Sequence, residues 1–216
     1  MILSLTRRSL AVCLASAVML IALPFANGAR AADDAASVFI STLGSRAVDI
    51  MKNKSSTTFE QREAQFKDLL VEGFHIKTIS RFVVGKYWKE ATDAQKAAYD
   101  DIFVAFITRV YAARFDSYSG QTFEMVETIK DPGGDEWVRT KILQPGGSQP
   151  IAVDYRVRLF DGQYKVIDVV VEGISMLNTH RVEFASVINK RGLDGLIAEL
   201  HARLEEPVAA AGQTGG

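Results

Sequence analysis

The chain has 216 residues, with 48% hydrophobic side chains and 25 Lys and Arg against 26 Asp and Glu. This length is sufficient for one domain with a substantial core. The near balance of charges argues against a nucleic-acid binder, which would carry a basic excess.

Residues 1–31 have the pattern of a secretory signal peptide. The pair Arg7-Arg8 makes a positive start, and the apolar run 10–23 is too short to span a membrane comfortably. Ala29-Arg30-Ala31 fits the small-x-small rule of signal peptidase, so we expect a mature start near Ala32. The arginine pair also resembles a twin-arginine signal. No cofactor motif follows that would require folded export, which favours the Sec route.

Cleavage of this leader would change the chemistry of the chain. Cys13 is the single cysteine, so the mature protein could form no disulfide and no thiolate metal site. The leader also contains three arginines and no acidic residue. After cleavage, 22 basic side chains would remain against 26 acidic ones, a net charge of −4. No second apolar run approaches the length of a membrane span, and we expect a soluble exported protein.

The first half of the mature chain has the apolar spacing of helices. The predicted helical stretches are 33–52, 59–73, short pieces within 74–88, and 92–118. Thr92 and Gln95 have the spacing of a capping box, which predicts the start of the longest helix. The inward stripe of this helix is rich in aromatic residues, which predicts core packing.

The second half changes to the alternation of strands. The predicted strands are 123–130, 136–143, 151–160 and 163–171, separated by turn sequences that include the hairpin signal Asp161-Gly162. Helices are then expected at 175–191 and 193–206, and a tail of small residues at 207–216 is expected to be disordered. Residues 32–206 would form a single α+β domain. In it, helices pack on a curled four-stranded antiparallel sheet, as in an NTF2-like cone.

The Asp161-Gly162 turn predicts a cross-strand register, provided that neither strand has a bulge. Tyr155 would then face Asp168, and the inner sheet face would be apolar except for these two residues. The opposite face would be basic, and would serve as a solvated surface or as a docking face for an acidic partner or anionic lipid. Its expected members are Arg139, Lys141, Arg156, Arg158 and Lys165.

Asp168 and Arg181 are charges on otherwise apolar stripes. Asp168 interrupts the apolar run 166–171, and Arg181 interrupts a helical stripe made by Leu177, Phe184 and Ile188. A lone buried charge is costly, so we predict a structural ion pair between them, with Glu172 as the alternative acid. Asp168 could instead be a general base, but a paired carboxylate stays charged and inert, which favours the ion pair.

Motifs of common enzyme and metal sites are missing from the sequence. It has no phosphate-binding loop, G-x-S-x-G, H-E-x-x-H or Gly-rich dinucleotide turn. His75, His180 and His201 do not have metal-ligand spacing, and we expect surface or capping roles for them. Ser175 is expected to cap a helix. We therefore expect no catalytic residue, no metal and no cofactor, and a protein that is not an enzyme.

Several motifs occur in an order and spacing typical of one known family. They are Phe74-His75-Ile76, Ile79-Ser80-Arg81, Val84-Gly85-Lys86-Tyr87-Trp88, Phe103-x-x-Phe106 with Tyr111, Tyr164-Lys165-Val166-x-Asp168, Val171-Glu172-Gly173-Ile174-Ser175 with Arg181 and Phe184, and Gly192-x-Asp194-Gly195-Leu196. Together they resemble the MlaC (toluene-tolerance) family of periplasmic phospholipid-binding proteins. The resemblance covers nearly the whole mature chain. One departure is His75, where many relatives carry an acid.

The resemblance implies that the helices and the sheet enclose a deep apolar pocket. The pocket would take the acyl chains of a phospholipid or related two-chain amphiphile, while the headgroup stays near solvent. The sequence does not distinguish a phospholipid from another amphiphile such as a hopanoid. It also implies a periplasmic carrier without a cofactor. Such a carrier would shuttle lipid between an inner-membrane ABC transporter complex, which includes an MCE-domain component, and an outer-membrane lipoprotein complex.

A pocket for two acyl chains would need about 1,000 Å³, the upper end of the usual range. The side chains expected to line it are large and mainly apolar. They are Phe82, Val83, Tyr87, Phe103, Phe106, Ile107, Val110, Tyr111, Tyr155, Val157, Val170, Ile174, Leu177, Phe184 and Ile188.

Two other functions are compatible with the residues alone. One is an enzyme of the small-cone class, with Asp168 as general base and Tyr155 as hydrogen-bond donor. The other is an envelope adaptor with a solid core and no ligand. Composition does not separate a solid core from a hollow one.

The leader generates the first testable prediction. N-terminal sequencing of the exported protein should begin at or near Ala32, because the small residues before it suit signal peptidase. Intact Met1 in the mature pool would contradict this prediction.

Overall fold

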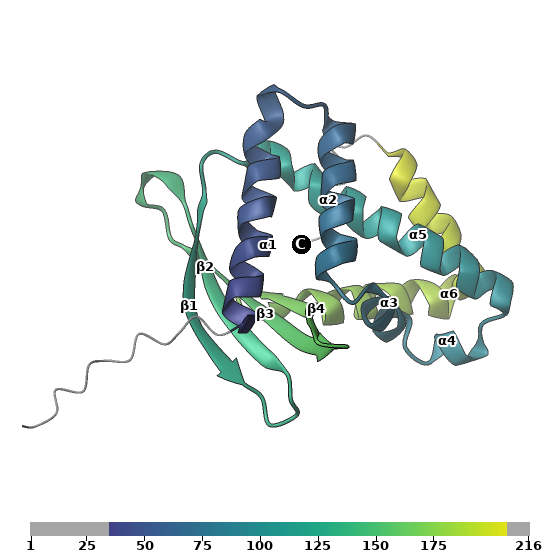
Figure 1. Ribbon diagram of the computed structural model, residues 1–216. Helices are drawn as coiled ribbons and strands as arrows, with labels where there is room; N and C mark the ends of the chain where they lie inside the picture. The colour runs from purple at the N-terminus through teal and green to yellow at the C-terminus, as the bar shows by residue number, and fades with distance from the viewer. Residues whose placement is uncertain (1–34, 207–216) are drawn as a thin grey trace, which may run out of the picture. The chain divides into compact units, whose positions relative to one another are not determined.

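The computed structural model describes residues 35–206, and the expected leader and C-terminal tail lie outside this range. Helices come first in the chain, an antiparallel sheet follows, and a long kinked helix ends the described part (Figure 1). The α+β prediction is therefore confirmed. None of the helices described is both long and apolar enough to cross a membrane.

The helices match the predicted stretches closely. They are α1 (Ala35–Lys52), α2 (Phe59–Gly73), α3 (Ile76–Val84), α4 (Tyr87–Glu90), α5 (Asp93–Ala112) and α6 (Met176–Glu205). Capping boxes begin two of them: the Thr58 hydroxyl accepts from Gln61 N in α2, and the Thr92 hydroxyl accepts from Gln95 N in α5. These bonds satisfy backbone N–H groups that have no partner in the first helical turn.

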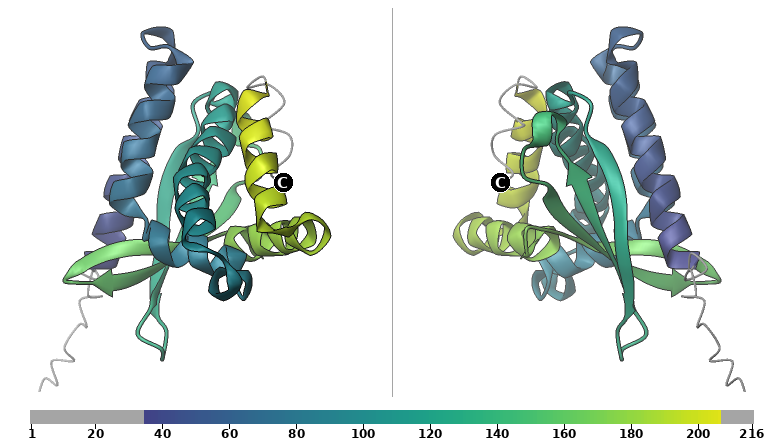
Figure 2. Two further views of the ribbon diagram at one scale, coloured as in Figure 1. Left: turned by 90° about the vertical axis from the view of Figure 1, so that its right-hand side faces the viewer. Right: turned by 90° about the vertical axis from the view of Figure 1, so that its left-hand side faces the viewer.

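Helix α6 covers both of the last two predicted helices. Gly192 joins its segments with φ 71° and ψ 178°, a conformation that is almost exclusive to glycine. The two segments therefore run in different directions, as the green and yellow parts of Figure 2 show. The glycine places the second segment against the first, and Leu193, Leu196 and Leu200 enter the core.

The sheet has five antiparallel strands in the order β1-β2-β3-β4-β5, where four were expected. They are β1 (Thr122–Lys130), β2 (Glu136–Leu143), β3 (Ile151–Phe160), β4 (Gln163–Val171) and β5 (Ile174–Ser175). The turn Glu172-Gly173, with positive φ at both residues, folds β5 back onto β4. The sequence missed β5 because two residues are too few to show alternation.

A β-bulge in β4 overturns part of the predicted register. Val157 pairs with Val166 as expected, but Arg156 then pairs with Asp168, so Ile167 is an extra residue. Tyr155 consequently faces Val169 rather than Asp168. The prediction had assumed two regular strands, whereas a bulge places two residues of one strand opposite one residue of the other.

Most of the core lies in two large clusters, and Ile50, Ala112 and Phe115 form a smaller third one. One lies among α3, α5 and α6 and contains Tyr99, Phe103, Phe106 and Phe184, each at most 1% exposed. The other lies between α1, α2 and one face of the sheet, and its buried members are Ala36, Ile40, Leu43, Leu69, Val138, Val157 and Val166. The space where these clusters meet is not filled completely, and the site described below lies there.

Candidate functional site

An apolar pocket of about 230 Å³ lies between the two core clusters. Helices α1, α2, α3, α5 and α6 supply most of its wall, and β3, β4 and Phe74, which lies between α2 and α3, supply the rest. The apolar lining consists of Ile40, Leu43, Gly44, Ala47, Phe66, Leu69, Leu70, Phe74, Ile76, Ile79, Val83, Phe103, Ile107, Ile167, Val169, Val171, Met176 and Leu177. Four polar side chains complete it, namely Tyr111, Tyr155, Asp168 and His180.

The structure places six of the expected lining residues on this pocket: Val83, Phe103, Ile107, Tyr111, Tyr155 and Leu177. Phe106, Val110, Phe184 and Ile188 are instead buried in the core cluster among α3, α5 and α6. Val157, a residue of β3, is fully buried in the cluster between the sheet, α1 and α2. Tyr87 lies against the other cluster, and its hydroxyl is bonded to Asn189. Phe82 and Ile174 are exposed, while Val170 lies on the outer sheet face.

The expected set omitted the contribution of α1 and α2. These helices supply Ile40, Leu43, Gly44, Ala47, Phe66, Leu69 and Leu70, and Phe74 follows directly after α2. Apolar spacing indicates which residues of a helix face inward. It does not show which inward residues meet packed neighbours and which border a cavity, because that depends on elements distant in sequence.

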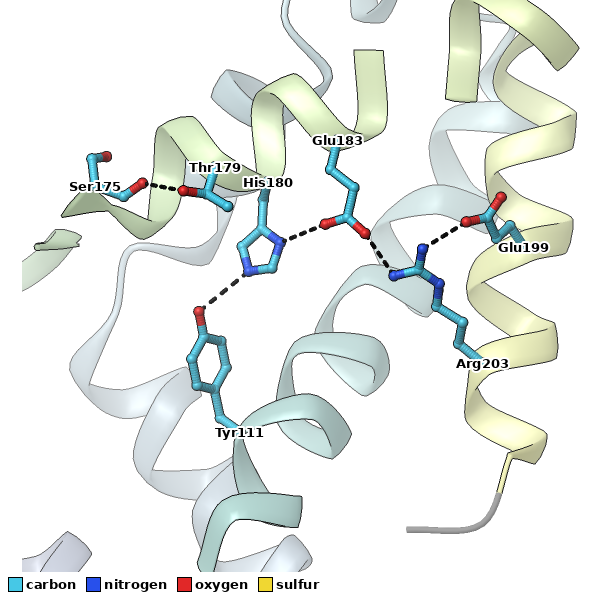
Figure 3. A network of polar contacts seen from close by, with 7 residues as sticks. All are labelled: Tyr111, Ser175, Thr179, His180, Glu183, Glu199 and Arg203. Carbon is cyan, nitrogen blue, oxygen red and sulfur yellow. Dashed lines mark hydrogen bonds and ion pairs between the residues drawn. The ribbon is translucent and has the colours of Figure 1, made fainter. Parts of the chain in front are cut away.

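A polar network borders one part of the pocket (Figure 3). The Tyr111 hydroxyl lies 3.2 Å from Nε2 of the buried His180, and His180 Nδ1 lies 3.5 Å from a Glu183 carboxylate oxygen. Glu183 also accepts from Arg203 at 2.7 Å, and Arg203 donates in turn to Glu199 at 2.7 Å. The network holds His180 inside the fold, so the expected surface or capping role is wrong for this histidine.

The network combines an ionised carboxylate with a neutral phenol. His180 and Arg203 lower the pKa of Glu183, so this carboxylate stays ionised beside an apolar pocket. Burial raises the pKa of Tyr111, so its hydroxyl remains protonated. The pocket therefore borders the network through a neutral phenol and an imidazole, and Arg203 lies behind them.

Asp168 and Arg181 do not form the predicted ion pair. The Asp168 carboxylate accepts from the Ser175 hydroxyl at 2.7 Å and from Leu177 N at 3.2 Å. The bulge turns Asp168 towards the start of α6, where backbone N–H groups lack helical partners. Arg181 is exposed, and its guanidinium lies 4.5 Å from the centre of the Phe82 ring.

Glu172 is not the partner of Arg181 either, because its carboxylate accepts from Ala152 N. Ser175 caps α6 as predicted, since its hydroxyl also accepts from Asn178 N at 3.0 Å. His75 caps α3 in the same way, through Thr78 N. Asp168 and Ser175 together therefore fix the start of α6 against β4.

The expected basic face carries acids as well as bases. Asp135, almost fully buried, binds Arg156 and Arg158, each at 2.6 Å. Its hydrogen bond with Arg158, together with Arg156, holds its pKa below the usual value. Arg139 contacts Glu127 at 2.8 Å and Asp154 at 3.7 Å. The three arginines are therefore neutralised locally.

The two lysines of the face differ. Lys165 donates to the backbone carbonyl of Glu72 at the end of α2. Lys141 is exposed on β2. Of the five basic residues, Lys141 is thus the one whose charge is available to an approaching surface. Separately, residues 35–206 contain no group of three or more His, Cys, Asp or Glu side chains that could hold a metal ion.

Comparison with known proteins adds evidence on the family. A family model described as "MlaC protein" matches residues 42–202. The Haemophilus influenzae "Intermembrane phospholipid transport system binding protein MlaC" is 29% identical over 130 residues, which is 58% of this chain and 60% of that protein. The chain thus spans about 60% of the length of this curated relative in the match.

A solved structure has a similar fold. It is described as the phospholipid-binding protein from Ralstonia solanacearum in complex with a phospholipid. It superposes with a TM-score of 0.69 at 24% identity, covering 78% of this chain and 98% of that one. At this identity the likeness supports a shared fold.

The contacts of Asp168 generate a stability prediction. Asp168→Ala should lower the free energy of unfolding by about 2 kcal/mol, because the Ser175 hydroxyl and Leu177 N lose their acceptor in a partly buried place. Arg181→Ala should cost less than about 1 kcal/mol, the range of an exposed cation–π contact. Denaturant unfolding of wild type and both variants measures these changes in the free energy of unfolding. Equal and large losses would instead indicate that the two side chains pair in solution.

Proposed function

Because the chain belongs to the MlaC family, we propose that it binds the acyl chains of a phospholipid, or of a similar two-chain amphiphile, in the pocket between helices and sheet. It then carries this lipid as the soluble periplasmic component of an ABC-type transport system. The observation that carries the proposal is an apolar pocket whose wall is formed by five helices and two strands of the fold.

The energetics suit a carrier. Burial of one methylene gains about 0.8 kcal/mol, so two acyl chains gain on the order of 20 kcal/mol. A bilayer offers a comparable gain, so the protein has to match the membrane rather than exceed it. Apolar walls are sufficient for that purpose, and the polar lining is confined to four side chains.

The pocket is smaller than the sequence-based expectation of about 1,000 Å³, and at about 230 Å³ it lies below the usual ligand range. Loading of two acyl chains therefore requires the pocket to widen. Its walls come from helices that are separate in the chain, so small outward shifts of α1 and α2 from α5 and β4 would enlarge it.

The partners follow from the same proposal. The curated relative is named as the binding protein of an intermembrane phospholipid transport system. For this chain we propose docking to an inner-membrane complex of an ABC transporter with an MCE-domain component, and to an outer-membrane lipoprotein complex. The leader would deliver the protein to the periplasm between them.

The two alternatives fit the geometry less well. An enzyme with Asp168 as base and Tyr155 as donor needs a carboxylate that is free to accept a proton from a substrate. The Asp168 carboxylate is instead occupied by two hydrogen bonds that fix the start of α6. A ligand-free adaptor would need no pocket among its core clusters.

The central prediction concerns lipid content. Wild-type protein purified from its own envelope without detergent should carry a two-chain lipid, detected by solvent extraction and mass spectrometry. Ile107→Asp should lose most of this lipid, because Ile107 lines the pocket and a charge is costly in a dry apolar space. The more obvious Phe106→Asp is unsuitable, because Phe106 lies in the packed core.

The matched control is Val182→Asp, which adds the same charge at an apolar residue of α6 that is 72% exposed. It should keep its lipid, and both variants should keep a native circular dichroism spectrum. Lipid-free wild-type protein would overturn the carrier proposal.

Docking through the outer sheet face generates a further prediction. Lys141→Glu should slow lipid transfer from loaded protein to inner-membrane vesicles about two- to fivefold at low salt, without changing lipid content, because exposed charges act on encounter rates. Lys67→Glu, a reversal at an exposed residue of α2, is the control. Equal transfer rates for the two variants would show that the outer sheet face is a solvated surface and not a docking face.

A further inference from the structure

The four polar side chains of the pocket differ in whether the protein satisfies them. Tyr111 and His180 bond to each other, and Asp168 accepts from Ser175 and Leu177 N. Tyr155 lines the same pocket, yet its hydroxyl has no hydrogen-bond partner among residues 35–206. Phenylalanine would fill this space without bringing an unpaired polar group into an apolar pocket.

Tyr155 is well suited to donate a hydrogen bond. Burial raises the pKa of its phenol to about 12, so the hydroxyl keeps its proton at physiological pH. The residue lies in the middle of β3, opposite Val169, and its ring packs edge-on against Phe123 at 6.4 Å between centres. A strand between two neighbouring strands holds the ring on a rigid element.

The pocket also restricts which acceptor could meet this hydroxyl. No lysine or arginine among residues 35–206 lines it. A phosphate anion would therefore find no counter-charge there. A neutral carbonyl oxygen needs none.

We propose that the Tyr155 hydroxyl donates a hydrogen bond to an ester carbonyl of the bound lipid, and so makes the pocket selective for acyl-ester over ether-linked chains. This inference rests on the proposed function, and it assigns Tyr155 a role in specificity within that site. The ester is the neutral acceptor at the head of each acyl chain, so a chain lying along the apolar wall can bring it to the hydroxyl.

The test compares two lipids that differ in this one group. Lipid-stripped protein is incubated with vesicles of equal amounts of a diacyl phosphatidylcholine and the dialkyl ether phosphatidylcholine of the same chain length. The protein is then re-isolated, and mass spectrometry gives the ratio of the two bound lipids. Wild type should favour the ester lipid about fivefold, the size expected for one neutral hydrogen bond.

Tyr155→Phe, which removes a single oxygen atom, should bring the ratio close to one. Tyr87→Phe is the matched control, because its hydroxyl bonds to Asn189 and does not line the pocket. It should keep the wild-type ratio. The wild-type measurement needs no variant, so it stands even if Tyr155→Phe folds poorly.

Three results would overturn the inference. An unchanged ester preference in Tyr155→Phe would show that another group reads the carbonyl. Recovery of both lipids by wild type in equal amounts would remove the selectivity but leave the proposed carrier function standing. Recovery of neither lipid would overturn this inference and the proposed function together.

Discussion

The site depends on one extra residue in β4. Ile167 bulges between Val166 and Asp168, so Val166 and Ile167 are both buried, one in the core cluster under α1 and one on the pocket. The same bulge turns Asp168 towards the start of α6, where it accepts from the Ser175 hydroxyl and Leu177 N. The wall of the pocket and the anchoring of α6 therefore share one irregularity of the sheet.

The buried apolar side chains are divided mainly between two clusters instead of forming a single core. The aromatic cluster around Phe103 and Phe184 holds α5 and α6 together, and the cluster around Ile40 and Val157 holds α1 to the sheet. Each cluster is well buried by itself, so the space between them need not be filled for the fold to persist. A protein built in this way can have an apolar pocket without depending on a ligand for its core.

Several charged groups that lie outside the pocket lining pair with one another. Arg203 links Glu183 to Glu199 behind His180, and Asp135 joins Arg156 to Arg158 on the far side of the sheet. Removal of one member of such a group leaves its partner without compensation, which costs more than the pair itself contributes. The lining of the pocket thus remains mainly apolar, and Asp168 is the one acidic residue among the described residues in it.

The sequence by itself determined the order and type of the elements, the capping of α5 by Thr92 and the hairpin at Asp161-Gly162, because these depend on neighbours within a few residues. The order and spacing of several short motifs also indicated the family. Only the tertiary structure decided the bulge at Ile167, the partners of Asp168 and the role of α1 and α2 in the pocket. These features arise where distant segments meet, and apolar spacing within one element carries no information about the space left between two.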